Sequence, residues 1–160
     1  MKLNIISLAL GSLALTTSAF GAEFTLSTGY PFVAQLQASH IIENGDARVY
    51  ANYKVGLDDG FSGGYERAFG DHSIGVMYGA LGARKTEDDC EQNNPIVGSL
   101  CGLGNVFGDR TTNGFGVTYQ YWFNGAFKPG WGIRLEGGYG DVTGTDEKRV
   151  DGNMTISYQF

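Results

Sequence analysis

VDGNMTISYQF, at residues 150–160, is the stretch of sequence that decides the fold. Its side chains alternate between apolar and polar over eleven positions. Because successive side chains of a β-strand point to opposite faces, this alternation predicts a strand with one apolar and one polar face. About eleven residues also suffice for a tilted strand to cross a bilayer. The apolar set is Val150, Met154, Ile156, Tyr158 and Phe160, with Gly152 among them, and the polar set is Asp151, Asn153, Thr155, Ser157 and Gln159.

The same alternation recurs in seven segments upstream, and it is weaker in the first two. In the fifth segment it predicts that Ala80 faces the same side as Ile74, Val76 and Tyr78. The segments are 24–30, 34–38, 48–57, 61–69, 74–80, 114–123 and 131–139.

Short turn sequences with Gly, Asn and Asp separate several of these segments, at residues 43–46, 58–60, 70–72 and 124–125. One connection, residues 85–111, is long. The pattern predicts a single all-β domain whose eight antiparallel strands follow one another up and down. A secreted β-sandwich is the competing fold, but it needs an apolar interior. We expect a barrel, because the second face of the strands carries Arg, Lys, Glu and Gln.

Residues 1–22 are typical of a secretory signal peptide. Lys2 provides a positive charge near the start, the stretch 5–15 is mainly apolar, and small residues follow at Ala19 and Gly21. We expect cleavage after Gly21 or Ala22, which leaves residues 23–160 as the mature chain. The alternative is a membrane anchor, for which this apolar stretch is short.

The composition is acidic and rich in glycine. The formal net charge is −6 at pH 7, with 26 Gly and only 3 Pro. An acidic balance argues against a nucleic-acid partner, which would favour a basic face. Beyond the signal peptide, no apolar run reaches the ~18 residues of a spanning helix.

One face of the last segment, with Ile156, Tyr158 and Phe160, resembles the C-terminal assembly signal of outer-membrane barrel proteins. The chain as a whole resembles the small eight-stranded antiparallel up-and-down transmembrane β-barrels of the OmpA and OmpX type. The resemblance implies a monomer in the outer membrane of a Gram-negative bacterium. It also implies insertion by the outer-membrane assembly machinery and contact with outer-membrane lipid and lipopolysaccharide. No motif identifies a narrower family.

In such a barrel we expect both termini in the periplasm. The connections near 31–33, 58–60, 85–111 and 141–149 then face outward, and the longest connections of outer-membrane barrels lie on that side. Aromatic residues near the strand ends predict two interfacial girdles. The periplasmic girdle is Phe24, Phe69, Tyr121, Phe123, Trp131, Tyr158 and Phe160, and the outer girdle is Tyr30, Phe32, Phe61, Phe115 and Tyr139.

The polar face of three segments carries charges that would point into the barrel. An unpaired buried charge is costly, so we expect these side chains to pair. One hypothesis is a structural network, and the other is a gated ion path, for which inward glycines such as Gly64, Gly116 and Gly138 would leave space for water. The charged residues are Arg48, Lys54, Glu66, Arg134 and Glu136.

Cys90 and Cys101 are the two cysteines of the chain and lie in the same long connection. In an exported protein an even cysteine count favours a disulfide, and we expect these two to be bonded. A metal site is the alternative, but two thiols with no histidine nearby are too few ligands.

The two histidines, in Ser39-His40 and Asp71-His72, lie near the expected periplasmic end. No nucleophile, base and orienting group converge at one level, so we expect no enzyme, no cofactor and no metal. The leading hypothesis is a structural or adhesion-like barrel that acts through the 85–111 loop and the 141–149 hairpin, including Arg149. The alternatives are a narrow ion or small-solute channel and a lipid A-modifying enzyme.

Overall fold

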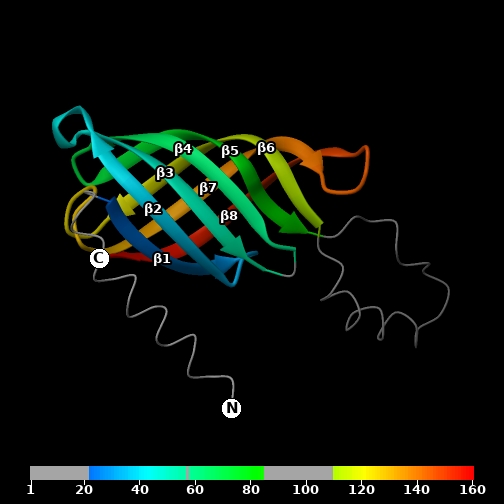
Figure 1. Cartoon of the computed structure of the whole chain (residues 1–160), viewed down its shortest axis with the longest axis horizontal. Coiled ribbons are helices and arrows are strands. Elements are labelled where there is room, and N and C mark those ends of the chain that lie inside the picture. The colour runs from blue at the N-terminus through cyan, green and yellow to red at the C-terminus, as the bar shows by residue number, and fades with distance from the viewer. Residues whose placement is uncertain (1–21, 57, 85–109) are drawn as a thin grey trace, which may run out of the picture.

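The computed structural model describes residues 22–56, 58–84 and 110–160. Within them the chain forms eight strands, each antiparallel to its neighbour in sequence, and β1 also pairs with β8. The sheet is a closed up-and-down barrel (Figure 1), so the predicted fold class is confirmed. The strands are β1 (Ala22–Tyr30), β2 (Ala34–Ile42), β3 (Ala47–Val55), β4 (Gly60–Phe69), β5 (His72–Arg84), β6 (Arg110–Trp122), β7 (Gly130–Val142) and β8 (Lys148–Gln159), with a 3-10 turn, η2, at Glu43–Gly45.

Three predictions lie outside the described residues. They are the signal peptide up to residue 21, the disulfide between Cys90 and Cys101, and the long outward loop as far as residue 109. Arg110 and Thr111, which the sequence places in the long connection, belong instead to β6.

The two ends of the barrel differ. β1 begins and β8 ends at the same end, which we call the terminal end, and the opposite end is the loop end. β5 to β8 have 13, 13, 13 and 12 residues, whereas β1 to β4 have 9, 9, 9 and 10. The last pair between β4 and β5 is Ser62 with Gly79, and β5 continues to Arg84, so this side of the barrel is taller at the loop end.

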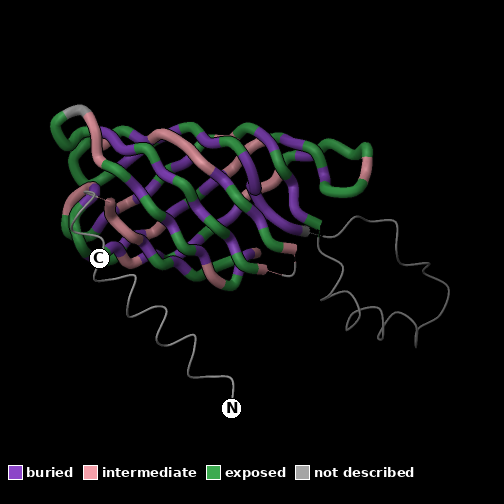
Figure 2. The backbone as a smooth tube through the Cα atoms, viewed as in Figure 1, coloured by how far each residue is buried: buried purple, intermediate pink, exposed green. Residues whose placement is uncertain are grey.

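Burial is inverted relative to a water-soluble protein. Along most of the sheet, exposed and buried residues alternate (Figure 2), and residues 79–83 of β5 are the main exception among the described strands. The outward side chains are large and apolar, whereas the buried ones are mostly polar or charged. Exposed aromatic residues form a terminal row of Phe69, Phe123, Trp131 and Phe160 and a loop row of Tyr30, Phe61, Phe115 and Tyr139.

Ala80 does not face outward with Tyr78, so that prediction is wrong. The register between β5 and β6 shifts between Ala80 and Gly82, which marks a β-bulge. Gly79 adopts a φ of 124°, a conformation that side-chain-bearing residues rarely take. A bulge adds a residue to one strand and turns the following side chains. Ala80, Leu81 and Ala83 are consequently all buried.

Phe32 is also misplaced by the sequence pattern, which assigns it to the outer girdle. It is 0% exposed and packs with Ala80 and Ala83. The connection between β1 and β2 therefore folds this ring inward over the loop end of the lumen, while Tyr30 stays outside.

Replacement of Gly79 by alanine is expected to destabilise the barrel. The backbone conformation alone costs an L-residue roughly 1–3 kcal/mol, and the new Cβ would collide with the carbonyl oxygen of Phe61. The free energy of unfolding in urea, followed by tryptophan fluorescence in detergent micelles, measures the effect. Gly137→Ala is the control, because its Cβ would meet no atom closer than 4.0 Å. If the two variants have the same free energy of unfolding, the backbone at position 79 accommodates a side chain without strain, which contradicts the prediction.

Candidate functional site

The five predicted lumen charges meet in one continuous chain of ion pairs. From the loop end to the terminal end its order is Lys54, Glu136, Arg134, Glu66 and Arg48, so cations and anions alternate. We call these five residues the ion-pair chain, and all of them are at most 5% exposed. Lys54 Nζ pairs with Glu136 Oε2. Arg134 Nε lies 2.6 Å from Glu136 Oε1, Arg134 Nη1 lies 2.5 Å from Glu66 Oε1, and Arg48 Nη2 lies 2.6 Å from Glu66 Oε2.

Strand register explains which of these contacts are local. Arg48 and Glu66 are direct partners of β3 and β4. Arg134 and Glu136 come from β7, so their contacts with Glu66 and Lys54 cross the lumen. The ion-pair chain therefore connects opposite walls of the barrel.

Neutral polar side chains donate or accept further hydrogen bonds at the charged groups, although Arg134 Nη2 has no hydrogen-bond partner among the described residues. Thr118 Oγ1 donates to Glu66 Oε1 at 2.9 Å, and Asn153 Nδ2 donates to Glu136 Oε2 at 2.7 Å. Arg48 and Arg134 both donate to Gln120 Oε1, at 3.1 Å each. Such hydrogen bonds are needed for buried charges, because the attraction within a pair alone does not reliably offset the loss of water.

Each cation of the ion-pair chain also lies over an aromatic ring. Lys54 Nζ is 5.4 Å from the ring centre of Phe32, and Arg134 Cζ is 4.7 Å from that of Tyr50. Arg48 Cζ lies 4.9 Å from the ring of Trp122 and 4.7 Å from that of Phe127. These distances are within the range of cation–π attraction.

The loop end of the lumen is closed by the bulged part of β5. Lys54 Nζ donates to the carbonyl oxygen of Ala80 at 2.6 Å, and Asn153 Nδ2 donates to that of Leu81 at 3.4 Å. A Cβ on Gly82 would lie 2.6 Å from the carbonyl oxygen of Gly152 on β8, a strand with which β5 does not pair. The bulged segment therefore lies across the lumen, and Phe32 packs against its Ala80 and Ala83.

The terminal end is closed by two aromatic side chains. Trp122 and Phe127 are 1% and 3% exposed and meet edge to face, with ring centres 6.1 Å apart. Gln159 Nε2 donates to the carbonyl oxygen of Phe127 at 2.8 Å, which ties the β6–β7 connection to β8. Both mouths of the barrel are therefore covered by the described residues.

At three of the inward glycines, the space that a side chain would take is already occupied by a neighbouring side chain. A Cβ on Gly64 would lie 2.7 Å from the Tyr50 hydroxyl, and one on Gly116 or Gly138 would lie 2.6 or 2.9 Å from Leu81 Cδ2. The glycines make room for these two large side chains, so the space for water that the ion-path hypothesis requires is filled at these three positions.

Arg149 belongs to the interior and not to the exposed hairpin, which corrects the prediction. It is 6% exposed, and its Nε lies 3.1 Å from Asp151 Oδ2 and donates to Thr112 Oγ1 at 2.8 Å. At the other end, Glu23 Oε2 accepts from Gln159 Nε2 at 2.5 Å. With these residues, the described interior holds Arg48, Lys54, Arg134 and Arg149 against Glu23, Glu66, Glu136 and Asp151.

The histidines and their neighbouring serines lie on opposite faces of the wall. Ser39 is buried and donates to the carbonyl oxygen of Glu23, whereas His40 is exposed on the outside. His72 Nδ1 lies 2.8 Å from the Tyr119 hydroxyl outside, whereas Ser73 accepts from Trp122 Nε1 inside. Neither Ser–His pair is arranged for nucleophilic catalysis. In the part of the chain that the structure describes, no cluster of His, Cys, Asp and Glu is placed to hold a metal ion.

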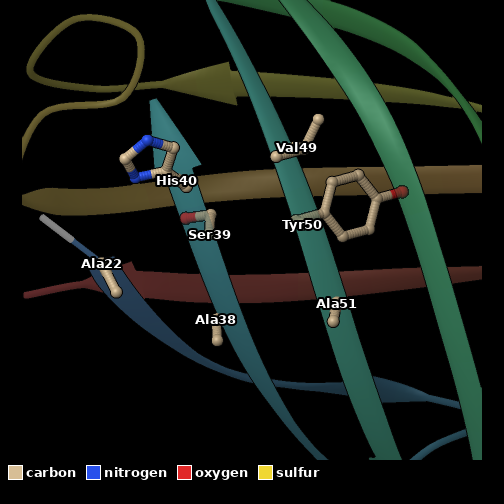
Figure 3. A pocket seen from close by; sticks show the side chains of 7 residues that line it. All are labelled: Ala22, Ala38, Ser39, His40, Val49, Tyr50 and Ala51. Carbon is tan, nitrogen blue, oxygen red and sulfur yellow. The ribbon is translucent and has the colours of Figure 1, made fainter. Parts of the chain in front are cut away.

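A shallow hollow lies on the outer wall across β1, β2 and β3. Its volume is about 320 Å³. Ala38 and Ala51 are paired across β2 and β3, and so are His40 and Val49, the next outward pair toward the terminal end (Figure 3). The lining residues are Ala22, Ala38, Ser39, His40, Val49, Tyr50 and Ala51.

The fold and interior define the class of the molecule as a small up-and-down antiparallel barrel with an apolar wall and a closed, charged lumen. Comparison with models of protein families, with curated proteins and with solved structures gives no match. Among the described residues, no helix has the length and apolar character to span a membrane.

Replacement of Glu66 by glutamine is expected to lower the free energy of unfolding by about 3–5 kcal/mol, the usual cost of breaking a buried ion pair. The change leaves Arg48 and Arg134 without the carboxylate between them. Urea unfolding in detergent micelles measures it. Asp141→Asn is the matched control, because its pair with Lys148 is 3.4 Å long and exposed, and such pairs contribute at most ~1 kcal/mol. An equally small effect of both changes would contradict a stabilising ion-pair chain.

Proposed function

We propose that the protein is an integral β-barrel of the outer membrane of a Gram-negative bacterium, with a structural or surface-interaction role and no catalytic activity. The observation that carries the proposal is the inverted distribution of side chains. Most outward residues between the two aromatic rows are apolar, and most buried residues of the described strands are polar or charged. Water-soluble monomers rarely expose a contiguous apolar surface of this extent, whereas a transmembrane barrel requires one.

The dimensions support the same proposal. Strands of 9 to 13 residues are as long as those that cross a bilayer with a tilt. The rows of exposed aromatic residues lie near the two ends of the apolar wall, as in the girdles at membrane interfaces. In this proposal the terminal end lies in the periplasm, so that the connection 85–109 faces the exterior.

The closed lumen supports a scaffold in preference to a channel. The ion-pair chain crosses the lumen, the bulged strand covers one mouth, and Trp122 and Phe127 cover the other. A rigid barrel of this kind is suited to hold loops at the cell surface. The working surface in this proposal is the connection 85–109, stabilised by a Cys90–Cys101 disulfide, together with the tip of the β7–β8 hairpin.

The partners we propose are outer-membrane lipid, lipopolysaccharide and the outer-membrane assembly machinery, and the barrel acts as a monomer. The outward face of β8 carries the proposed assembly signal, Ile156, Tyr158 and Phe160. Tyr158 meets both Trp131 and Phe160 edge to face, at 5.1 and 5.2 Å between ring centres. This aromatic edge is the surface that an assembly factor would contact.

Membrane fractionation tests the location. The protein is expected in the outer-membrane fraction, and its unheated form is expected to migrate faster on a gel than the boiled form, because a folded barrel stays compact. The periplasmic fraction of the same cells is the control. Recovery of the protein as a soluble periplasmic species would overturn the proposal.

Single-channel recording in planar bilayers tests the closed lumen. We expect no conductance steps from the wild type or from Phe32→Ala, because the backbone of the bulged β5 segment still covers the lumen in that variant. Insertion in the same bilayers is checked by gel migration of the recovered protein. Reproducible steps from the inserted wild type would favour the channel.

A further inference from the structure

Arg67 is an unusual residue on the outer wall of the barrel. It follows the buried Glu66 on β4, and its own side chain is exposed on the same face as Phe61 and Phe69. Among the described strands, it is the one Lys, Arg, Asp or Glu that faces outward between the terminal and loop aromatic rows. It is not a member of the ion pairs found among the described side chains.

The position of Arg67 along the strand explains how a cation is tolerated there. Phe69, two residues further along β4, belongs to the terminal row. The cost of a charge on the lipid-facing wall falls toward the interfaces, and a long side chain can extend its head group to that level. In a barrel inserted as proposed, the guanidinium of Arg67 would reach the level of the lipid head groups at the terminal end.

Two further polar side chains lie beside Arg67. Ile74 of β5 is the direct partner of both Arg67 on β4 and Tyr119 on β6, so these two residues flank it in one row. His72 is two residues from Ile74 on the same face, diagonal to both, and its Nδ1 is 2.8 Å from the Tyr119 hydroxyl. Diagonal neighbours in a sheet are within reach of long side chains.

We propose that Arg67, His72 and Tyr119 form a binding site for the phosphate of a phospholipid in the leaflet at the terminal end of the barrel. A guanidinium offers paired donors that match phosphate oxygens, and the imidazole and phenol add hydrogen-bonding groups on the other side of Ile74. The inference rests on the proposed membrane location, since the site faces lipid only in an inserted barrel.

The hollow on the outer wall gives the same lipid a place for an acyl chain. Val49 pairs with Tyr65, and Ala47 pairs with Arg67, so Val49 is a diagonal neighbour of Arg67. From Val49 the hollow continues to Ala38 and Ala51, away from the terminal end and toward the middle of the wall (Figure 3). A lipid with its phosphate at Arg67 would thus direct a chain over these small side chains.

Native mass spectrometry of the folded protein tests the site, with phosphatidylglycerol as the probe and diacylglycerol as the lipid without phosphate. Wild type is expected to bind phosphatidylglycerol in preference to diacylglycerol. Arg67→Gln is expected to weaken that binding about tenfold, the loss that corresponds to one charge-assisted hydrogen bond. Tyr119→Phe is expected to weaken it as well, and Arg67→Lys to retain part of it.

Lys148→Gln is the matched control, because it removes the same charge at the loop end, and its binding is expected to equal that of wild type. The inference is overturned if Arg67→Gln and Tyr119→Phe bind as wild type does, if Lys148→Gln loses as much, or if the site prefers lipopolysaccharide. Insertion into phosphatidylcholine vesicles is measured on the same samples. If wild type inserts but Arg67→Gln and Tyr119→Phe lose no phosphatidylglycerol binding, this site alone is refuted, whereas wild type that never inserts refutes the proposed function as well.

Discussion

The double contact of Arg134 is the interaction on which the interior depends. Its guanidinium lies between Glu66 and Glu136, and its face covers the ring of Tyr50. The same two carboxylates also pair with Arg48 and Lys54, so each charge of the ion-pair chain is neutralised only as part of the whole chain. Because burial of any one charge is favourable only when the others are present, the lumen behaves as a single unit. The glycines opposite Tyr50 and Leu81 belong to that unit, since they provide the space for those side chains.

The strand pattern and the inward position of the five charges could be predicted from the sequence, because both follow from alternation with a period of two. Residues such as Glu66 and Arg134 fall on the polar face in any register. Their partners could not be predicted in the same way. The contact between Lys54 and Glu136 crosses the lumen, and it depends on how the strands are staggered around the closed barrel.

The elements that close the lumen escaped the sequence pattern for identifiable physical reasons. Ala80 turns inward because a bulge interrupts the alternation, and the only local signal is Gly79. Phe32 lies in a connection, where alternation gives no direction. Arg149 is different, because it continues the inward series of Asp151 and Asn153 by one more step, and an extension of the pattern would have found it. Trp122 likewise falls on the polar face of its segment, although its role as a cover depends on Phe127.

Because β5 to β8 are longer than β1 to β4, one side of the barrel wall extends further at the loop end than the other side. Outward residues on the extended part are polar, with Asn113, Asp141 and Lys148 among them, so this part of the wall suits water and not lipid. The β7–β8 hairpin stands on that wall, while the short β1–β2 and β3–β4 connections stay low on the other side. In the proposed membrane orientation, a large molecule at the loop end would meet the longer strands β5 to β8 on one side and the shorter strands β1 to β4 on the other. The loop end of the described barrel is therefore asymmetric, with the longer strands and these polar outward residues on the same side.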